Sequence, residues 1–442
     1  MNETPQKSLR ILLSAYACEP GKGSEPGVGW GWARALARRG HEVRVLTRRN
    51  NQAAIERGFD RLEPIIQERL HFLYYDLPRW ASWWKKGGRG VHLYYMLWQW
   101  GAYLLAKQKH AEEKFDYVHH VTFVSIRQPS FMGELGIPFI FGPVAGGERA
   151  PWRLRSNFAW RGQVWDGVRD VFNALVRFDP LMWRTFSRAE RIFVTSEETR
   201  DLIPRKFREK TQIHLAIALD SQEAATGEMS DARDVQAEEA FSPRILYVGN
   251  FLYFKGMRFG IQSFAALVKH YPHARLSMVG SGPYEQDWRQ VTRNLGVEDK
   301  VEWIPRVKQS ELASIYRNHD VFLFPSLHDS GGMVVLEAMQ QGLPVVCMKL
   351  GGPGKLVNET CGIALDTSGH TVASITAELA VALVRILADR QALARLSAGA
   401  RQRVLEFSWD RLADDIYAPI DLRVAASVAH YQPENGQPEK VK

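Results

Sequence analysis

Two carboxylates in the second half of the chain bracket a glycine turn. Asp329 precedes a Ser-Gly-Gly sequence, and Glu337 lies eight positions after it. An apolar run ending at Ser326 predicts a buried strand, and the residues from Met333 to Gln341 predict a helix. The turn therefore lies at the carboxyl end of a strand, which is the edge where open α/β sheets bind ligands.

The start of this predicted helix is suited to an anion. Its first turn leaves backbone N–H groups without partners and carries the positive end of the helix dipole, which stabilises a diphosphate whose charge grows as a bonded sugar departs. Glu337, one turn into the helix, can reach ribose hydroxyls. The pattern predicts a nucleotide-sugar site, although a strand, turn and helix with acidic residues also occurs in α/β proteins without this ligand.

The sequence after the helix extends the pattern. Residues 341–346 read Gln-Gly-Leu-Pro-Val-Val, and residues 350–354 read Leu-Gly-Gly-Pro-Gly. In this order the chain resembles the retaining glycosyltransferases of family 4 (glycosyl transferases group 1), whose hallmark is Glu, seven residues, Glu. Asp329 stands here in the first position. The resemblance covers about residues 8 to 422.

The resemblance implies an α/β protein of the GT-B fold. Two Rossmann-like α/β/α domains would face each other across a cleft, and a C-terminal helix would cross back to the first domain. The length of 442 residues also favours two domains. The predicted segments are an acceptor-binding domain (1–212), a linker (213–242), a nucleotide-sugar donor domain (243–410), a cross-back helix (411–431) and a disordered tail (432–442).

Composition narrows the class of protein without choosing a ligand. Hydrophobic residues make up 45% and charged residues 24%, as in a soluble globular protein, and the net charge of +8 favours nucleic acid, an anionic membrane or an anionic substrate. The three cysteines form neither a metal-ligand spacing nor an even set, which indicates a reducing compartment and a cytoplasmic protein. We expect no signal peptide and no transmembrane helix.

Glycines and a lysine outside the central motif extend the predicted donor site. Gly27 and Gly29 stand where a loop turns into the first helix and would let a phosphate approach the backbone, although a loop without ligand has the same composition. In the second domain the family usually has an arginine where this chain has Asn250. Lys255 is in place to pair with the diphosphate, and Arg258 is a candidate to replace the missing charge.

The resemblance assigns the remaining roles. Asp329 would bind sugar hydroxyls, and His120, at a strand end, would contact the transferred sugar or the acceptor, with His119 as the alternative and a hydrogen-bonded structural histidine as the simpler interpretation. The predicted catalytic residues are His120, Lys255, Asp329 and Glu337. The predicted donor-binding residues are Gly27, Gly29, Asn250, Lys255, Gly282, Arg306, Val307, Asp329, Gly331, Gly332, Met333, Val334 and Glu337.

We expect no cofactor beyond the substrate, a UDP- or GDP-linked sugar. The chain has no Asp-x-Asp pair arranged to hold a divalent ion, so no metal site is predicted, and positive protein groups would stabilise the leaving phosphate. In the family that phosphate itself accepts the proton of the acceptor hydroxyl, so the resemblance requires no separate general base.

Two stretches mix tryptophan with basic residues. Residues 77–110 and 152–183 have the composition of a surface that settles on an anionic membrane, although their aromatic residues could equally pack in the core. We therefore predict a cytoplasmic protein with possible peripheral contact to the inner face of the cytoplasmic membrane. We predict no nucleic-acid partner, since no nucleic-acid-binding module is recognised.

These observations predict a retaining hexosyltransferase. It would move a hexose from a nucleotide-diphosphate sugar to a glycan or lipid-linked saccharide in bacterial exopolysaccharide or lipopolysaccharide synthesis. The alternatives are a GT-B nucleotide-sugar epimerase or phosphorylase, a non-catalytic saccharide- or nucleotide-binding GT-B protein, which the Asp329 and Asn250 departures favour, and, more remotely, a nucleic-acid-binding protein.

Overall fold

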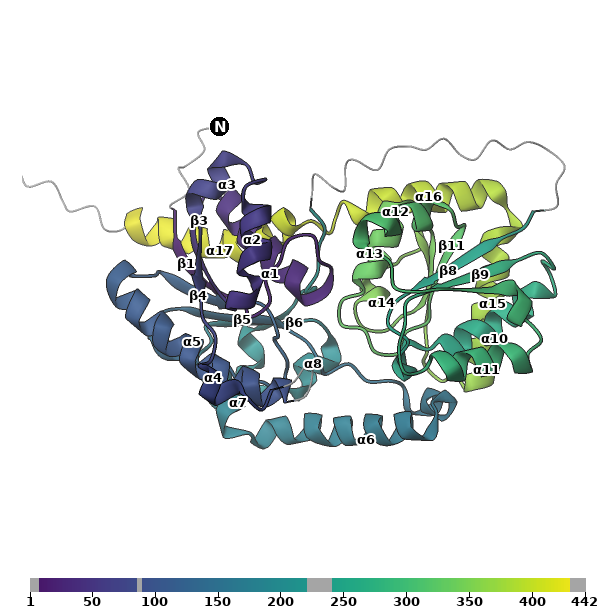
Figure 1. Cartoon of the computed structure of the whole chain (residues 1–442), viewed down its shortest axis with the longest axis horizontal. Helices are drawn as coiled ribbons and strands as arrows, with labels where there is room; N and C mark the ends of the chain where they lie inside the picture. The colour runs from purple at the N-terminus through teal and green to yellow at the C-terminus, as the bar shows by residue number, and fades with distance from the viewer. Residues whose placement is uncertain (1–7, 86–89, 221–240, 430–442) are drawn as a thin grey trace, which may run out of the picture.

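Two parallel β-sheets, each flanked by helices, form two domains that lie side by side (Figure 1). The computed structural model describes residues 8–85, 90–220 and 241–429. Most of the predicted linker (213–242) and the whole predicted tail (432–442) lie outside the described residues. The predicted fold class, an α/β protein with two Rossmann-like domains, is confirmed.

The first sheet has seven strands in the order β3-β2-β1-β4-β5-β6-β7, and every neighbouring pair is parallel. Its central strands are almost fully buried, because helices cover both faces of a parallel sheet. The strands are β1 (Arg10–Ser14), β2 (Glu42–Thr47), β3 (Leu70–Tyr74), β4 (Tyr117–His120), β5 (Phe139–Val144), β6 (Arg191–Val194) and β7 (Thr211–Ile213).

The second sheet has six strands in the order β10-β9-β8-β11-β12-β13, again all parallel. In both sheets the order reverses beside the first strand, and such a switch point opens a crevice at the carboxyl ends of the strands. The strands are β8 (Arg244–Val248), β9 (Arg275–Val279), β10 (Val301–Ile304), β11 (Val321–Phe324), β12 (Val345–Met348) and β13 (Gly362–Leu365).

Helices connect the strands and cover the sheets. Those of the first domain are α1 (Ser24–Arg38), α2 (Gln52–Phe59), α3 (Pro64–Arg69), α4 (Arg79–Ser82), α5 (Val91–Glu113), α6 (Trp160–Leu175), α7 (Pro180–Arg188) and α8 (Glu197–Leu202). Those of the second are α10 (Met257–Val268), α11 (Glu285–Asn294), α12 (Gln309–Arg317), α13 (Met333–Gln340), α14 (Pro353–Leu356), α15 (Val372–Ala388) and α16 (Arg390–Val404). None of the described helices is long and apolar enough to cross a membrane.

The last helix, α17 (Trp409–Ala429), returns to the first domain and lies across it, as predicted (Figure 1). The buried Tyr417 hydroxyl lies 2.9 Å from Nδ1 of His119 at the end of β4. Arg39, at the end of α1, forms an ion pair of 3.0 Å with Asp421. These contacts join α17 to β4 and to the end of α1.

Helix α6 connects the domains on another side, where it runs along the lower edge of the molecule from the first domain to the second (Figure 1). On its inner face the fully buried Asp166 forms an ion pair of 2.9 Å with Arg155 and a hydrogen bond of 2.7 Å with Nε2 of His328, in the second domain. Phe158, just before α6, packs edge-on against Tyr253 at 5.0 Å between ring centres. The two domains therefore share a buried polar contact and an aromatic one.

We predict that Gly31→Ala lowers the melting temperature. A Cβ at Gly31, in α1, would lie 2.1 Å from Cε2 of the Trp409 side chain, so the ring and the start of α17 would have to move. Overpacking of this kind costs about 1–3 kcal/mol in the free energy of unfolding. Differential scanning calorimetry measures the change.

Gly167→Ala is the matched control. Gly167 also lies in a helix, α6, but a Cβ there meets nothing within 4 Å. This substitution should leave stability unchanged or raise it by about 0.5–1 kcal/mol, because alanine is the better helix former. Equal effects of both substitutions would show that the contact between α1 and Trp409 does not determine the stability measured.

Candidate functional site

A cavity of about 680 Å³ lies between the two domains at the carboxyl ends of their strands. The predicted donor-binding residues that line it all belong to the second domain, and the first domain contributes the loop before α1 and residues at the ends of β4 and β5. The predicted site residues that line it are Asn250, Lys255, Arg306, Val307, Asp329, Gly331, Gly332, Met333, Val334 and Glu337.

Lys255 and Asp329 form an ion pair at the edge of this cavity. Their side chains are only 16% and 14% exposed, so the pair is shielded from water. Lys255 is followed by Gly256, which has a φ of 70° and packs so closely against the carbonyl of Pro325 that a side chain there would clash. In this state the charge of the lysine is balanced by the aspartate, and an incoming anion must share or replace that partner.

Backbone contacts fix the loop that carries Asp329. The carbonyl of Asp329 accepts a hydrogen bond of 2.8 Å from the N–H of Gly352, and its Oδ1 accepts one of 3.3 Å from Gly331. A Cβ on Gly351, whose φ is 53°, would lie 2.1 Å from the carbonyl oxygen of Asp329. The glycine pair after β12 therefore positions the loop rather than meeting a ligand directly.

Glu337 lies on α13 and is 9% exposed at the cavity wall. One carboxylate oxygen accepts a hydrogen bond of 2.7 Å from Gln309, and the other accepts one of 3.0 Å from the hydroxyl of Tyr316. Burial raises the pKa of Glu337, and these two hydrogen bonds oppose the shift only in part. Neither partner was predicted from the sequence, because neither lies in the motif.

Helix α13 begins at the cavity as the sequence predicted. Gly332, which precedes it, has a φ of 83°, and no side chain caps the first turn. Met333 and Val334, the first helical residues, line the cavity. A negatively charged group placed here would meet the positive end of the helix dipole.

A second cation lines the cavity beside Asn250. The side-chain oxygen of Asn250 accepts a hydrogen bond from Arg306, which follows β10 and also lines the cavity. Arg258, the sequence-based candidate for this role, instead pairs with Asp287 and does not line the cavity. Arg306 is therefore the guanidinium that reaches this end of the site.

Three predicted glycines do not line the cavity. Gly27 and Gly29 lie inside α1, where an added Cβ would lie 2.2 Å from the carbonyl oxygen of Lys22 and 2.1 Å from that of Ala17. Gly282 packs in the same way against the backbone of Phe251. These glycines are needed for close packing, and the cavity is lined instead by Gly21, Lys22, Gly23, Gly249 and Gly280.

His120 also lies away from the cavity. It is 1% exposed, and its Nε2 lies 2.8 Å from the hydroxyl of Tyr95 and 3.1 Å from the amide nitrogen of Gln99, both on α5. Burial lowers its pKa to about 4, which keeps the ring neutral at pH 7. The alternative, His119, is buried on the other face of the sheet, so the prediction of a histidine in the cleft is not met by either residue.

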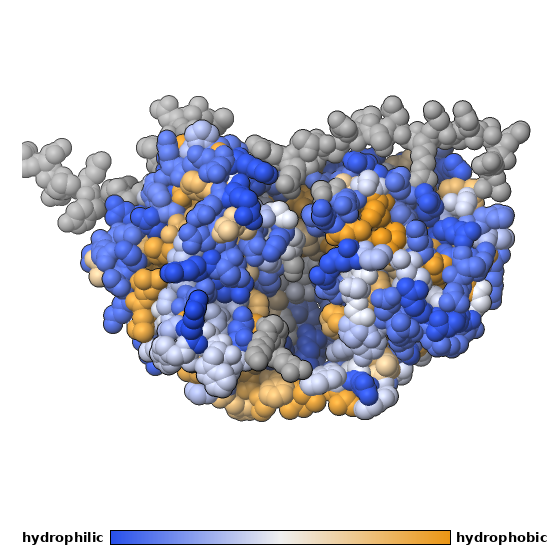
Figure 2. Space-filling view, in the orientation of Figure 1, coloured by the Kyte–Doolittle hydropathy of each residue, from blue (hydrophilic) through white to orange (hydrophobic). Residues whose placement is uncertain are grey.

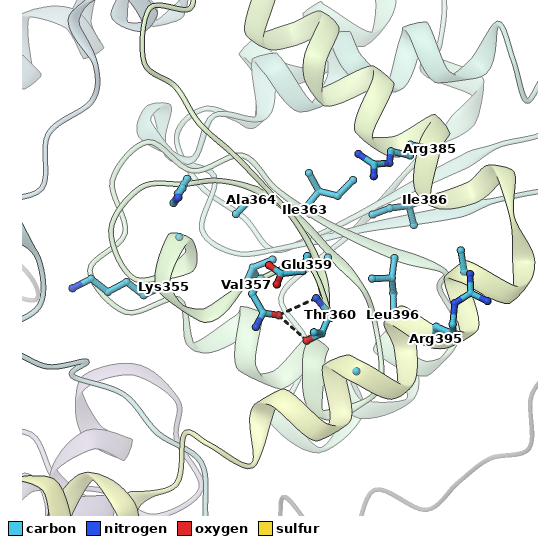
Figure 3. Close-up of a pocket in the computed structure, with 16 residues that line it drawn as sticks. Lys355, Val357, Glu359, Thr360, Ile363, Ala364, Arg385, Ile386, Arg395 and Leu396 are labelled. Atoms are coloured by element: carbon cyan, nitrogen blue, oxygen red, sulfur yellow. Dashed lines mark hydrogen bonds between the residues drawn. The ribbon is translucent and has the colours of Figure 1, made fainter.

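A larger hollow of about 870 Å³ lies elsewhere, in the second domain beside β13, α15 and α16 (Figure 3). Its lining includes Lys355, Glu359, Arg385 and Arg395, and the side chain of Thr360 is held by Asn358. None of the predicted site residues lines it. Size alone therefore does not locate the site, whereas the chemistry of the lining does.

Among the described residues, no group of three or more His, Cys, Asp or Glu side chains is arranged to hold a metal ion. The cations that the cavity offers are Lys22, Lys255 and Arg306. The arrangement can bind a diphosphate through these groups and the start of α13, and hydroxyl groups through Asp329 and Glu337.

Two family models match this chain. The model described as "Glycosyl transferase 4-like domain" matches residues 26–216, and the one described as "Glycosyl transferases group 1" matches residues 229–403. A D-inositol 3-phosphate glycosyltransferase of Saccharomonospora viridis is 28% identical over 246 residues, which are 52% of this chain and 56% of that protein. The chain thus spans about half the length of this curated relative.

Solved structures share the fold over nearly the whole chain. A sucrose-phosphate synthase of Thermosynechococcus elongatus has a TM-score of 0.59 at 19% identity and covers 95% of this chain and 100% of its own. Anabaena HepE in complex with UDP and glucose has a TM-score of 0.55 at 16% identity, with 96% and 100% covered. With one model on each domain, and glycosyltransferases among its relatives, this chain belongs to the group 1 glycosyl transferases.

Proposed function

We propose that the protein is a retaining glycosyltransferase that moves a hexose from a UDP- or GDP-linked sugar to a hydroxyl of a glycan or lipid-linked saccharide. The observation that carries the proposal is the interdomain cavity, in which a partly buried lysine, two carboxylates and an uncapped helix start meet. These groups match the diphosphate, the ribose and the sugar of such a donor.

Lys255 and Arg306, together with the first turn of α13, would hold the diphosphate. Donor binding would transfer Lys255 from Asp329 to a phosphate oxygen, which would release the aspartate to accept hydrogen bonds from sugar hydroxyls. Glu337, held by Gln309 and Tyr316, would accept hydrogen bonds from the ribose. These cations would oppose the negative charge that grows on the leaving phosphate, which is an electrostatic stabilisation of the transition state.

In the proposed reaction the bond between the anomeric carbon and the diphosphate oxygen breaks, and the acceptor oxygen forms its bond to the same face of that carbon. The acceptor proton passes to the departing phosphate oxygen, so the charges balance without a protein base. We propose that no divalent ion is required, because Lys255, Arg306 and the helix dipole supply positive charge at the diphosphate.

We also propose that α6 rests on an anionic membrane, where a lipid-linked acceptor would be found. Seven apolar residues of α6 recur every one to four positions and are exposed, so they form one face of the helix that we call the α6 apolar face: Trp160, Val164, Trp165, Val168, Val171, Phe172 and Leu175. Figure 2 shows hydrophobic residues along the lower edge of the molecule, where α6 runs. Exposed Arg153, Arg161 and Arg177 flank this face and suit anionic headgroups.

The first tryptophan-rich stretch divides between core and surface. Tyr95 and Trp98 of α5 are fully buried, whereas Trp80 and Trp83, in and beside α4, are 79% and 76% exposed. The described aromatic residues of this stretch therefore divide between the core and the surface. The exposed tryptophans give the proposed membrane contact a second apolar patch on the same domain.

Lys255→Ala should lower kcat/KM for transfer by about 10²–10³-fold, because one group that stabilises the leaving phosphate is lost. The measurement is nucleoside diphosphate release from a panel of UDP- and GDP-linked hexoses, with EDTA present throughout. The wild-type protein should keep its full turnover in EDTA, and the product should keep the donor's anomeric configuration by NMR.

Lys269→Ala is the control, since Lys269 is an exposed lysine just after α10 in the same domain. It should retain wild-type turnover. Full activity of Lys255→Ala would contradict the placement of the diphosphate, loss of activity in EDTA would contradict metal independence, and an inverted product would contradict retention.

Glu337→Gln should reduce turnover yet make the protein more stable at pH 7. The pKa of Glu337 is raised in the folded state, so as pH rises above about 4.3 the unfolded chain loses its proton first and wild-type stability falls. Glutamine has no proton to lose and removes this penalty. Thermal unfolding at pH 4 and pH 7 should show a stability advantage of the variant that grows with pH.

The opposite trend would be a variant that becomes less stable than the wild type as pH rises. It would show that the surroundings of Glu337 favour its ionised carboxylate. Glu302→Gln serves as the comparison, because Glu302 is an exposed residue of β10 outside the cavity. Its stability difference from wild type should not grow between the two pH values in the same way.

Trp165→Ser and Phe172→Ser should each weaken binding to vesicles of anionic phospholipid by about tenfold or more, since burial of such a side chain contributes about 1.5–3 kcal/mol. Both residues are mainly exposed, at 66% and 59%, so thermal stability should be unchanged. Vesicle co-sedimentation measures the binding.

Val381→Ser, at an equally exposed apolar residue of α15, should bind vesicles as the wild type does. An exposed apolar face can also join two copies of a protein, and sedimentation equilibrium of the same proteins tests this alternative. A wild-type dimer that dissociates in the Trp165 and Phe172 variants would replace the membrane proposal with contact between two copies.

A further inference from the structure

A second cavity, of about 450 Å³, adjoins the donor cavity on the side of the first domain. Lys255, Asp329 and Ser330 line both, so a molecule in the second cavity would lie beside the bond that the proposed reaction breaks. We call it the acceptor cavity. Most of its remaining lining lies in the loops after β4 and β5, and it includes two arginines, Arg127 of the loop after β4 and Arg169 of α6.

Partners other than carboxylates hold both arginines in place. Arg127 donates a hydrogen bond of 2.6 Å to the side-chain oxygen of Asn173, on α6. Arg169 donates one of 2.7 Å to Nδ1 of His328 and one of 3.2 Å to the carbonyl of Gly146. The amide of Asn173 donates to that same carbonyl, at 3.1 Å, so the two guanidinium groups belong to one connected network. Across the described ranges neither arginine forms an ion pair.

The carboxylates of the acceptor cavity have partners of their own. Glu148 is 5% exposed and accepts hydrogen bonds from Thr195, at 2.7 Å, and from the N–H of Gly146, at 2.9 Å. Glu25 accepts one of 2.7 Å from the N–H of Phe123, and Asp329 pairs with Lys255. Glu148 attracts Arg127 from a distance, yet burial and the positive charge of Arg169 lower the pKa of Arg127. The charges of Arg127 and Arg169 are therefore not balanced by direct contacts with these carboxylates.

We infer that Arg127 and Arg169 form a subsite for a phosphate group carried by the acceptor. The inference rests on the proposed glycosyl transfer and specifies its acceptor. Two guanidinium groups match the charge of a phosphate and offer it paired hydrogen bonds. No carboxylate is among the partners that orient the arginines, so their charge is not cancelled by a direct contact and the subsite is formed before the phosphate arrives.

The same helix links this subsite to the proposed membrane surface. Arg169 and Asn173 lie on the inner side of α6, while Trp165 and Phe172 lie on its exposed side. A phosphate that joins a saccharide to a lipid would lie at the boundary between them. A phosphate ester on a free saccharide has the same chemistry, and the experiment below separates the two sources.

Inorganic phosphate is the first probe, titrated calorimetrically into the full chain. Arg127→Gln and Arg169→Gln keep hydrogen-bonding groups but lose the charge, and each should weaken binding by about 10- to 100-fold. Arg57→Gln removes an exposed arginine of α2, in the same domain but outside both cavities, and should bind as the wild type does. Equal affinities for all four proteins would overturn the inference, whatever their enzymatic activity.

Transfer assays then test the role of the subsite. The wild type should transfer to a saccharide with a phosphate ester with a kcat/KM about 10- to 100-fold higher than to the same saccharide without it. In Arg127→Gln the ratio of these two kcat/KM values should fall toward one. If the wild type prefers the soluble phosphate ester, the phosphate recognised belongs to the saccharide. If it prefers only a saccharide joined to a lipid by a diphosphate, the phosphate recognised belongs to the lipid carrier. An unchanged preference in the variant overturns the inference. A wild type that turns over no nucleotide sugar contradicts the proposed function, while the phosphate titration still decides the subsite.

Discussion

The buried carboxylate of Asp166 joins the two domains, and the site depends on that junction. It is fully buried, pairs with Arg155 in its own domain and accepts a hydrogen bond from His328 of the other. Burial alone would raise its pKa, but His328, Arg155 and Arg169 lower it, so the group stays ionised. Removing one partner would leave a buried charge without compensation, which makes this contact a strong constraint on the domain arrangement.

This junction lies beside both cavities. His328 immediately precedes Asp329, so the residue that fixes the domains also fixes the start of the loop that pairs with Lys255. On the other side His328 accepts from Arg169, which lines the acceptor cavity. The donor site, the acceptor cavity and the interdomain contact are therefore one connected set of polar side chains, and a shift of either domain would change all three.

Helix α6 connects this set of polar side chains to the surface of the protein. Its inner side carries Asp166, Arg169 and Asn173, and its outer side is the α6 apolar face. Such an arrangement is unusual for a surface helix, whose apolar side normally faces the core. The polar residues point inward because they meet partners from the second domain and from the loop after β5, which satisfy them without water.

The sequence determined the fold class and the local frame of the donor site. A strand, a glycine turn and a helix follow one another between Val321 and Gln340, so their geometry is set by neighbours in the chain, and Asp329, Glu337 and the start of α13 lie where the sequence predicted. The family resemblance implied two Rossmann-like domains and the returning helix, and the structure has both.

Only the tertiary structure decided which distant residues meet. The sequence showed two adjacent histidines at a strand end, and the alternation of side chains along a strand placed one on each face of the sheet. Both are buried, because α5 covers one face and α17 covers the other. Gly27 and Gly29 have the composition of a phosphate loop but serve close packing inside α1. The pairing of Lys255 with Asp329, the place of Arg306 beside Asn250 and the two arginines of the acceptor cavity join residues tens of positions apart. Contacts of that kind follow from how helices and sheets pack, which local pattern does not encode.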